Sequence, residues 1–256
     1  MKIGILGASG RMGQLLTREV AATDGAVLAA AVVSAQSKVL GQPVENVTFT
    51  SDAEAAFETC DVLIDFALPA TTAHHVMLAA RHKKPLVIGT TGFHAAAQHD
   101  IDAAAQTIPV LQSANMSVGI TLLAALVEQA AARLGDDFDI EVFEAHHRHK
   151  ADAPSGTALL LAHAAAKGRK VDPATHISPP YHGHSLREKG SIGMSVMRAG
   201  DIVGEHTVTF GGMGERVELT HKASDRSIFA RGAVRAAMWL RDQKPGKYSL
   251  RDFLAI

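Results

Sequence analysis

The first thirteen residues constrain the fold more than any other part of the chain. Lys2–Leu6 is a short apolar run with the length of a buried strand, and the turn Gly7-Ala-Ser-Gly-Arg-Met-Gly13 follows it directly. From Met12 to about Ala22 the composition is that of a helix. A strand, a glycine-rich turn and a helix in this order predict the first unit of a dinucleotide-binding, Rossmann-like fold.

The glycines in this turn have the spacing G-x-x-G-x-x-G, with Ser9 where the common fingerprint has its second glycine. Glycines permit the tight turn and let the backbone approach a pyrophosphate, which rests on the N-terminus of the helix. Glycine turns after strands also occur without a ligand, and Arg11 is either a phosphate contact or a solvated arginine. Because this turn follows a buried strand, we predict that it binds a dinucleotide through Gly7, Ala8, Ser9, Gly10, Arg11 and Met12.

Strands and helices continue to alternate as far as residue 112. Apolar runs typical of strands lie at residues 26–33, 47–50, 61–66, 85–88 and 108–112. Helices are expected between them, at residues 52–59, 71–82 and 93–106. This alternation predicts an α/β domain with a parallel, doubly wound sheet.

In such sheets, ligands bind beyond the carboxyl ends of the strands. Those ends are the glycine turn, residues 66–67 and two later segments rich in small and polar residues. Taken singly, each is equally an ordinary turn or helix cap, but their convergence on one edge favours a cofactor cleft. The predicted cofactor site therefore also includes Gly89, Thr90, Thr91, Ser113, Ala114, Asn115 and Met116.

The pattern changes after Asn115. Expected elements are a helix at Val118–Leu134, a strand at 139–144, a helix from 155 to about 167, a long loop at 171–190, and strands at 192–198, 204–210 and 216–221. The last three strands, separated only by turns, predict an antiparallel run, and consecutive strands indicate a second domain of α+β type.

A final amphipathic helix begins at Ser227 and carries Phe229, Ala233, Ala236 and Leu240 on one face. We expect it to pack back on the first domain. The predicted domains are therefore a dinucleotide-binding domain at 1–117 with 227–256, and a substrate-binding domain at 118–226.

The segment from Glu144 to Ala158, E-A-H-H-R-H-K-A-D-A-P-S-G-T-A, has the highest density of reactive side chains. Three imidazoles, a guanidinium and an ammonium lie within five residues. They stand between a strand end and a helix for which Ser155 is a good N-cap. Cations beside the free N–H groups of a helix start form a receptor for a small anion, and a carboxylate is the anion we expect.

Two other interpretations apply to the same segment. Three histidines in four residues can bind zinc, but in an extended loop His146 and His147 point to opposite sides, and no cysteine cluster or H-x-x-x-H helix accompanies them. The segment can also be a solvated basic loop ahead of a well-capped helix. We predict an anion site without a metal.

Composition limits the partners and the compartment. The formal charge of −1 over 256 residues does not indicate binding to nucleic acid or to an anionic membrane. A single cysteine, Cys60, fits a reducing compartment. The chain enters a strand at Lys2 without a signal-peptide pattern, and the apolar runs at 27–33 and 118–127 are too short to span a bilayer. We expect a soluble, cytoplasmic protein.

The central segment resembles the signature of the dihydrodipicolinate reductase family, E-x-H-H-x-x-K-x-D-x-P-S-G-T-A. It matches at every specified position from Glu144 to Ala158. Further blocks similar to those of the family, in the same order, lie at residues 7–13, 89–93, 115–119, 198–206 and 221–226. The resemblance therefore covers essentially the whole chain.

The resemblance implies a nucleotide domain closed by the C-terminal segment and a substrate domain whose sheets assemble a homotetramer. It also implies that NADH or NADPH reduces the cyclic imine derived from 4-hydroxy-tetrahydrodipicolinate to tetrahydrodipicolinate, in the diaminopimelate route to lysine. By resemblance, His146 and Lys150 are the proton donors and His147 contacts the substrate. The expected carboxylate contacts are the amides of Gly156 and Thr157, with Thr91 on the other side near the nicotinamide.

One position departs from the pattern of many NAD enzymes. About twenty residues after the glycine turn, those enzymes carry an acid that binds the ribose hydroxyls. Here the position falls at Val33-Ser34, which we include in the cofactor site. We predict that both cofactors are used. A non-catalytic nucleotide-binding sensor is the alternative function, because a dinucleotide fold does not dictate catalysis.

Overall fold

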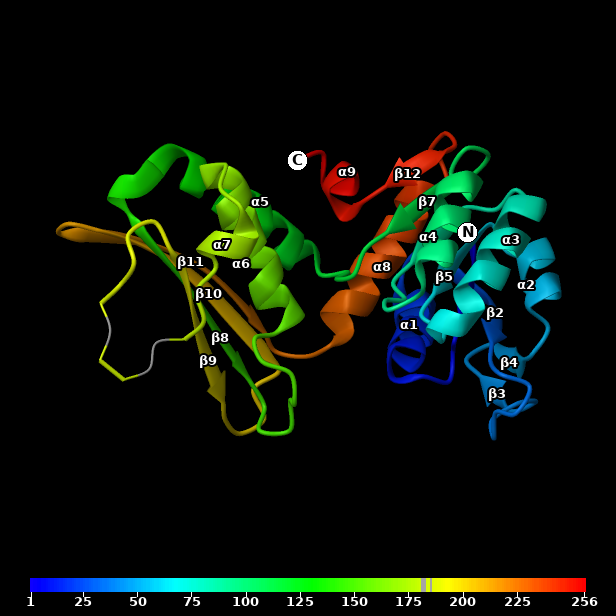
Figure 1. Cartoon of the computed structure of the whole chain (residues 1–256). Helices are drawn as coiled ribbons and strands as arrows, with labels where there is room; N and C mark the ends of the chain where they lie inside the picture. Colours follow the sequence, from blue (N-terminus) through cyan, green and yellow to red (C-terminus); the bar gives the residue numbers. More distant parts are fainter. Residues whose placement is uncertain (181–182, 185) are drawn as a thin grey trace. The chain divides into compact units, whose positions relative to one another are not determined.

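The computed structural model describes residues 1–180, 183–184 and 186–256 (Figure 1). These residues form two compact units. Unit 1 comprises Met1–Val118 and Ser227–Ala255, and unit 2 comprises Gly119–Arg226 with Ile256. Part of the long loop predicted at 171–190, namely residues 181, 182 and 185, lies outside the described residues.

Unit 1 contains an eight-stranded sheet in the order β12-β7-β6-β5-β1-β2-β4-β3. Its neighbouring strands are parallel except for the β3–β4 pair. The chain builds one side of the sheet from β1 through β4 and the other from β5 through β7, so the strand order reverses between β1 and β5. The bounds are β1 (Lys2–Leu6), β2 (Val27–Val32), β3 (Pro43–Val44), β4 (Val47–Thr50), β5 (Val62–Asp65), β6 (Leu86–Ile88), β7 (Pro109–Gln112) and β12 (Gly246–Tyr248).

Two hydrophobic clusters cover the two faces of this sheet. One contains Ile3 and Ile5 of β1 and residues of two helices, α1 (Arg11–Ala22) and α8 (Ser227–Leu240). The other contains Leu6 and residues of α2 (Ala53–Thr59), α3 (Thr72–Arg81) and α4 (Ala95–Ala104). Both faces are therefore buried, which explains why the strands are continuous apolar runs rather than alternating ones. The short elements η1 (Pro69–Thr71) and α9 (Leu250–Leu254) complete unit 1.

Helix α8 returns the end of the chain to the core of unit 1. Ala233, Ala236 and Leu240 are fully buried there, and Phe229 is partly buried. Gly232 permits close packing, because a Cβ at that position would lie 1.8 Å from the carbonyl oxygen of Met116. The helix thereby holds the segment that follows β7.

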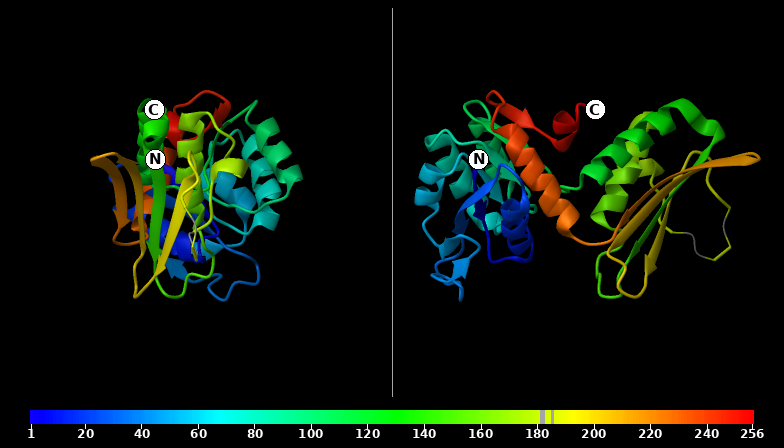
Figure 2. Two further views of the ribbon diagram at one scale, coloured as in Figure 1. Left: turned by 60° about the vertical axis from the view of Figure 1, so that its left-hand side comes forward. Right: turned by 180° about the vertical axis from the view of Figure 1, so that it is seen from behind.

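Unit 2 contains a four-stranded sheet in the order β11-β10-β8-β9. Helices α5 and α6 lie on one face of it (Figures 1 and 2), and their apolar residues share one cluster with Ile140, Val142 and Phe210. The bounds are α5 (Val118–Leu134), η2 (Gly135–Asp137), β8 (Asp139–His146), α6 (Gly156–Arg169), α7 (Pro173–His176), β9 (Ile192–Arg198), β10 (Gly204–Gly212) and β11 (Glu215–Ala223).

The prediction of an antiparallel run was wrong for β9. This strand pairs in parallel with β8, from Ile140↔Ile192 to His146↔Arg198, whereas β10 pairs antiparallel with β8 on its other side. The reason is the helix between them, because a crossover through α6 returns the chain in the same direction as β8. The long loop also contains a short helix, α7, capped by Asp172.

Helix α5 and the turn after it form a longer apolar segment than the run seen in the sequence. An 18-residue window within Val118–Asp137 has a mean hydropathy of 1.3, and among the described residues this is the one helix long and apolar enough to cross a membrane by length and composition. Ile120, Leu123 and Val127 of this helix face the hydrophobic cluster of unit 2. The helix therefore serves as a core helix in this fold.

Candidate active site

The glycine turn of unit 1 has the geometry that a pyrophosphate requires. Gly7 has a φ of +82°, and a Cβ there would lie 2.7 Å from the Cα of Ala67. A Cβ on Gly13 would lie 2.2 Å from the oxygen of Gly7. The first amides of α1 have no intrahelical partners, and their N-cap is Gly10, which has no side chain to cap them. The residues present therefore fit a dinucleotide.

The ends of β6 and β7, on the same edge, carry most of the remaining predicted cofactor residues. Gly89 follows β6, and a Cβ there would lie 2.1 Å from the ring of Phe66. The hydroxyl of Thr90 points inward, whereas Thr91 is exposed. After β7, the Ser113 hydroxyl donates to the Asn115 carbonyl oxygen at 2.7 Å. Four predicted cofactor residues, Ala8, Val33, Thr90 and Met116, have buried side chains and can offer a ligand only their backbone.

The end of β2 holds the position of the missing ribose-binding acid. The side chain of Val33 is 5% exposed and belongs to the core, so only its backbone faces the edge of the sheet. Ser34 is exposed, and its hydroxyl donates to Gln36 Oε1 at 2.7 Å. The backbone amide of Gln36 in turn donates to that hydroxyl at 3.2 Å. The side chains that replace the acid are thus uncharged.

In unit 2, the predicted proton-donor loop is anchored by a buried carboxylate. Glu144 is fully buried on β8 and receives the Nδ1–H of His146 at 2.5 Å. Arg198 on β9 binds both carboxylate oxygens at 2.8 Å, and the amide of Ser155 donates to Oε1 at 2.9 Å. Burial raises the pKa of Glu144, but the guanidinium, the imidazole and the amide together outweigh burial and leave the pKa below its ordinary value.

His146 is held in one orientation by this carboxylate. Its Nδ1 is committed to Glu144, so Nε2 is the atom that can exchange a proton with a ligand. Gly204 leaves room beside it, since a Cβ there would lie 3.1 Å from Nε2. Burial lowers the pKa of His146 below its ordinary value, and the Glu144 carboxylate only partly offsets this.

His206 on β10 supports the same arrangement. Its Nε2 lies 3.1 Å from the hydroxyl of Ser155, and its ring meets the edge of the His146 ring with centroids 5.2 Å apart. The Ser155 hydroxyl also caps α6 by accepting from the amide of Ala158 at 3.1 Å. Burial lowers the pKa of His206 to about 4, so the imidazole is neutral near pH 7.

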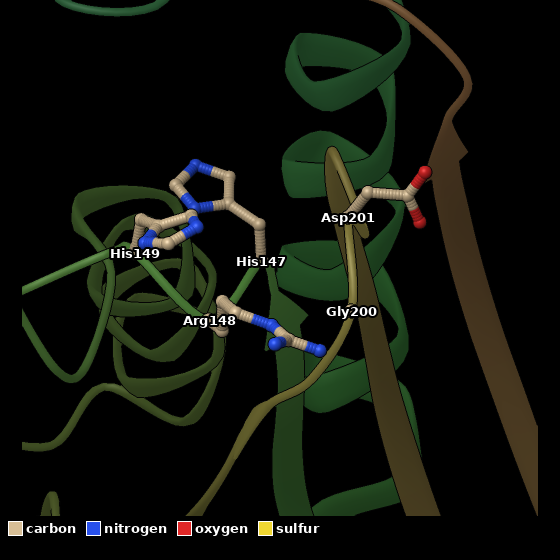
Figure 3. A pocket seen from close by; sticks show the side chains of 5 residues that line it. All are labelled: His147, Arg148, His149, Gly200 and Asp201. Atoms are coloured by element: carbon tan, nitrogen blue, oxygen red, sulfur yellow. The ribbon is translucent and has the colours of Figure 1, made fainter.

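The remaining loop residues are more exposed. Lys150 binds both carboxylate oxygens of Asp152 at 2.8 Å, and its ammonium lowers the pKa of Asp152. His147 Nε2 lies 3.4 Å from Arg226 Nη2. A hollow of about 650 Å³ opens beside this loop, and its lining residues are His147, Arg148, His149, Gly200 and Asp201. The imidazoles of His147 and His149 lie beside each other there (Figure 3).

The helix that follows the loop begins where the sequence predicts. Ser155 is the N-cap of α6, and Gly156 and Thr157 are its first two residues. Gly156 is exposed, and a Cβ there would meet nothing within 4 Å, so an anion can approach its backbone. The structure thus brings His146, Ser155 and this helix start together through one carboxylate, Glu144.

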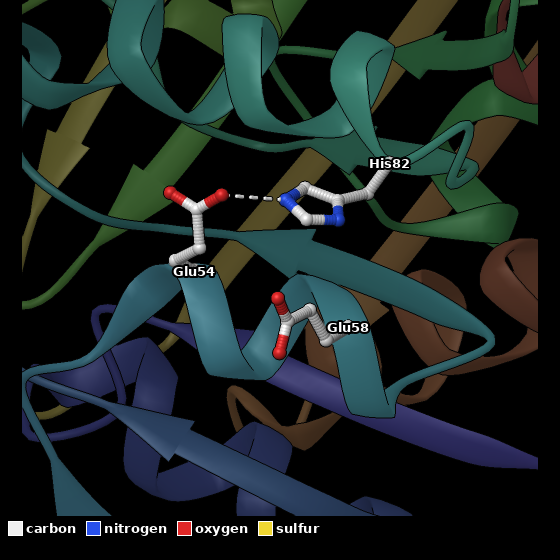
Figure 4. Close-up of side chains that lie close together, drawn as sticks. All are labelled: Glu54, Glu58 and His82. Carbon is white, nitrogen blue, oxygen red and sulfur yellow. Dashed lines mark hydrogen bonds and ion pairs between the residues drawn. The ribbon is translucent and has the colours of Figure 1, made fainter.

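Possible metal ligands gather elsewhere. Among the described residues, the one group of three with ligand atoms within 4.8 Å of one another is Glu54, Glu58 and His82 in unit 1 (Figure 4). His82 Nε2 bonds Glu54 at 2.9 Å, and Arg81 pairs with the same oxygen at 3.1 Å. Glu54 therefore takes part in a surface ion pair, which explains its position without a metal ion.

The sequence did not assign a role to Arg198 or His206. Both residues reach the site through strand pairing, since Arg198 is opposite His146 and His206 is opposite Glu144. Each lies more than fifty residues from its partner along the chain, so no local pattern connects them. The available signal was the position of both residues in blocks that resemble the family.

Comparison with known proteins gives consistent matches over both units. Residues 1–116 match the family model "Dihydrodipicolinate reductase, N-terminus", and residues 119–254 match "Dihydrodipicolinate reductase, C-terminus". Relatives named 4-hydroxy-tetrahydrodipicolinate reductase from Methylocella silvestris and Allorhizobium ampelinum are each 48% identical over the whole of this chain and over 97% and 98% of their own lengths.

A solved structure resembles the whole fold. It is described as a dipicolinate-bound dihydrodipicolinate reductase from Paenisporosarcina sp. TG-14, with a TM-score of 0.83, 26% identity and coverage of 98% of both chains. A probable dehydrogenase from Thermotoga maritima has a TM-score of 0.63 at 11% identity and covers 98% of this chain and 92% of its own, which indicates a shared fold only.

Proposed function

The chain belongs to the dihydrodipicolinate reductase family, and we propose that it reduces the cyclic imine derived from 4-hydroxy-tetrahydrodipicolinate to tetrahydrodipicolinate. The hydride donor is NADH or NADPH, and the reaction belongs to the diaminopimelate route of lysine biosynthesis. The observation that carries the proposal is the arrangement of His146, Glu144 and the start of α6, which combines a proton donor with a carboxylate receptor.

The glycine turn and the two neighbouring strand ends of unit 1 hold the cofactor in this proposal. The amides at the start of α1 take the pyrophosphate, and Arg11 stands on the exposed surface beside them. The segments Gly89–Thr91 and Ser113–Met116 contribute mainly backbone groups. When bound, NADH or NADPH supplies a hydride to the unsaturated ring of the substrate.

The residues of unit 2 bind the dicarboxylate and supply the proton. The amides of Gly156 and Thr157 hold one carboxylate at the helix start, and His147 contacts the substrate. We assign Thr91 as a further substrate contact. Hydride addition leaves negative charge on the ring, which Nε2 of His146 or Nζ of Lys150 neutralises with a proton. A bound dianion favours the charged imidazole, and so it raises the pKa that burial has lowered.

The proposal extends to assembly and compartment. We infer a homotetramer formed through the sheet of unit 2, because in the described residues the face opposite α5 and α6 has no helix packed on it (Figure 2). We also infer a cytoplasmic enzyme, in keeping with a biosynthetic family whose members act on soluble metabolites.

The loss of NAD(P)H absorbance in the presence of freshly prepared substrate tests the function. Wild-type protein should turn over, whereas His146→Gln and Lys150→Met should each be slower by roughly 10²- to 10⁴-fold, the usual range of acid–base catalysis. Their cofactor dissociation constants should stay near the wild-type value, since neither residue lies in unit 1.

Two results would contradict the proposal. Tight cofactor binding without turnover would favour the alternative of a non-catalytic NAD(P)-binding sensor. Near-normal turnover in both variants would mean that other residues donate the proton. Metal analysis of the active protein separates this mechanism from a zinc-dependent hydrolysis by the imidazoles.

A further inference from the structure

A carboxylate and an imidazole that the proposed chemistry does not use lie buried beneath the cofactor edge of unit 1. Asp65 is the last residue of β5 and is fully buried, after three apolar core residues. His75 on α3 is 6% exposed, and its Nδ1 lies 3.0 Å from Asp65 Oδ2. Burying a carboxylate is costly unless each oxygen is satisfied, so its other contacts indicate what it organises.

The second oxygen of Asp65 joins two strand-end loops. Oδ1 accepts from the backbone amide of Ala67 at 2.8 Å and from the hydroxyl of Thr90 at 3.2 Å. The amide of Gly89 donates to the main-chain oxygen of Asp65 at 2.9 Å. The loop after β5 and the loop after β6 are therefore tied to the same residue.

The loop after β5 also packs against two glycines of the predicted cofactor site. A Cβ on Gly7 would lie 2.7 Å from Ala67 Cα, and a Cβ on Gly89 would lie 2.1 Å from the ring of Phe66. A shift of the 66–67 backbone would therefore move the glycine turn, the Gly89 segment or both. The glycine turn follows β1 and the 66–67 loop follows β5, and the strand order reverses between these two strands, where ligands of such sheets bind.

We propose that Asp65 and His75 are positioning residues that set the dinucleotide-binding loops of unit 1. His75 donates to Oδ2 and thereby leaves Oδ1 to hold Ala67 and Thr90. The imidazole does not touch the ligand in this proposal. The inference rests on the proposed function, because it assumes that the loops bind NADH or NADPH.

Three variants of the full-length protein separate positioning from general stability. His75→Leu removes the donor, whereas His75→Asn keeps an N–H close to the place of Nδ1. His74→Leu is the matched control, because it removes an exposed imidazole from the neighbouring position of the same helix. The dissociation constant for NADPH is measured by titration calorimetry, together with KM for each substrate and kcat.

The expected result is a selective loss of cofactor affinity. His75→Leu should raise the dissociation constant and KM for NADPH about tenfold or more, with KM for the imine substrate unchanged and most of kcat retained at saturating NADPH. His75→Asn should stay within about threefold of wild type, and His74→Leu should match wild type.

Four outcomes would contradict either the inference or the proposed function. Wild-type NADPH affinity in His75→Leu, or equal losses in His75→Leu and His75→Asn, overturns the inference. If His75→Leu does not fold, Thr90→Val tests the other side of the Asp65 carboxylate by removing the hydroxyl that donates to Oδ1, and an unchanged dissociation constant in that variant overturns the inference. Failure of wild-type protein to bind either nicotinamide cofactor refutes the proposed function instead.

Discussion

Glu144 is the residue on which the orientation of His146 depends. Its carboxylate accepts from the imidazole, from Nη1 and Nη2 of Arg198 and from the amide of Ser155. Leaving one member of such a buried pair without its partner typically costs about 3–5 kcal/mol. The contacts of Glu144 therefore explain why His146, the Arg198 guanidinium and the start of α6 keep a fixed geometry.

The pH dependence of turnover tests this role. A general acid must be protonated, so kcat/KM falls as the pH rises through the pKa of His146 in the free enzyme. Glu144 raises that pKa, although burial keeps it below the ordinary value. Glu144→Gln should therefore move the falling limb to lower pH by about one to two units. The pH profile of kcat/KM measures the shift.

The control for this prediction is the His146→Gln variant. Adding Glu144→Gln to it should not move any remaining limb, because the titrating imidazole has gone. A limb that stays in place in the single Glu144→Gln variant would assign the titration to another group.

His206 gives a second prediction, concerning stability. Its pKa of about 4 lies below the ordinary 6.5, so between these values the unfolded chain binds more protons than the folded one. The stability that neutral His206 contributes is thus fully present above pH 6.5 and is lost as the pH falls toward 4. The loss is about 3 kcal/mol for a shift of this size.

Unfolding of the full-length protein at several pH values measures this contribution. His206→Gln should flatten the dependence of the unfolding free energy on pH between about 6.5 and 4, since glutamine keeps a polar group near Ser155 but does not titrate. His163→Gln, an exposed histidine on α6, is the control and should keep the wild-type slope. An unchanged slope in His206→Gln would mean that the imidazole is charged in the folded state.

At the scale of elements, strong periodicity was enough to identify most strands and helices. β1, β4, α5 and β9 have the predicted bounds, and the other long elements differ by a few residues at their ends. Short elements such as β3, β12, α7 and α9 were missed, because two to five residues carry no measurable period. β12 exists through its pairing with β7, a contact between residues far apart in the chain.

Strand pairing also limited how much of the candidate site could be predicted from the sequence. The glycine turn and the 144–158 segment are local patterns, and the sequence displays both. The contacts of Arg198 and His206 with Glu144 depend on which strands flank β8, and the sequence prediction of an antiparallel run had the wrong neighbour for β9. Residues that act across a sheet therefore needed the structure.

We expect the end of β2 to govern cofactor choice. An acid there binds the ribose hydroxyls of NADH and repels the 2′-phosphate of NADPH, but Ser34 carries no charge. We expect wild-type catalytic efficiencies with the two cofactors to agree within about tenfold, or 1.4 kcal/mol. Because Val33 is buried, the informative substitution is Ser34→Asp, whose carboxylate can still accept from the amide of Gln36.

Steady-state kinetics with each cofactor measures the effect. Ser34→Asp should shift the ratio of kcat/KM values toward NADH by about tenfold or more. Gln106→Glu is the control, because it adds the same charge at an exposed position before β7, on the opposite edge of the sheet. A wild-type preference for NADH of a hundredfold would show that another group replaces the acid.

At the scale of the whole molecule, the face of the unit 2 sheet opposite α5 and α6 requires an explanation. Phe143, Ser195, Thr207 and Thr220 lie side by side on this face across all four strands. The two threonine hydroxyls bond each other at 3.0 Å, and none of the four residues is charged. An uncharged row in the middle of a sheet face is suited to burial against a second copy of the chain.

Light scattering tests the proposed homotetramer, which has four times the chain mass of 27.0 kDa. Thr207→Arg places a charge in the middle of the row, where contact with a neighbouring subunit would leave it buried and unpaired. This variant should therefore dissociate to smaller species, while Thr59→Arg, at an exposed site on α2, should keep the wild-type mass. A wild-type monomer, or a Thr207→Arg variant of unchanged mass, would exclude this face as the subunit interface.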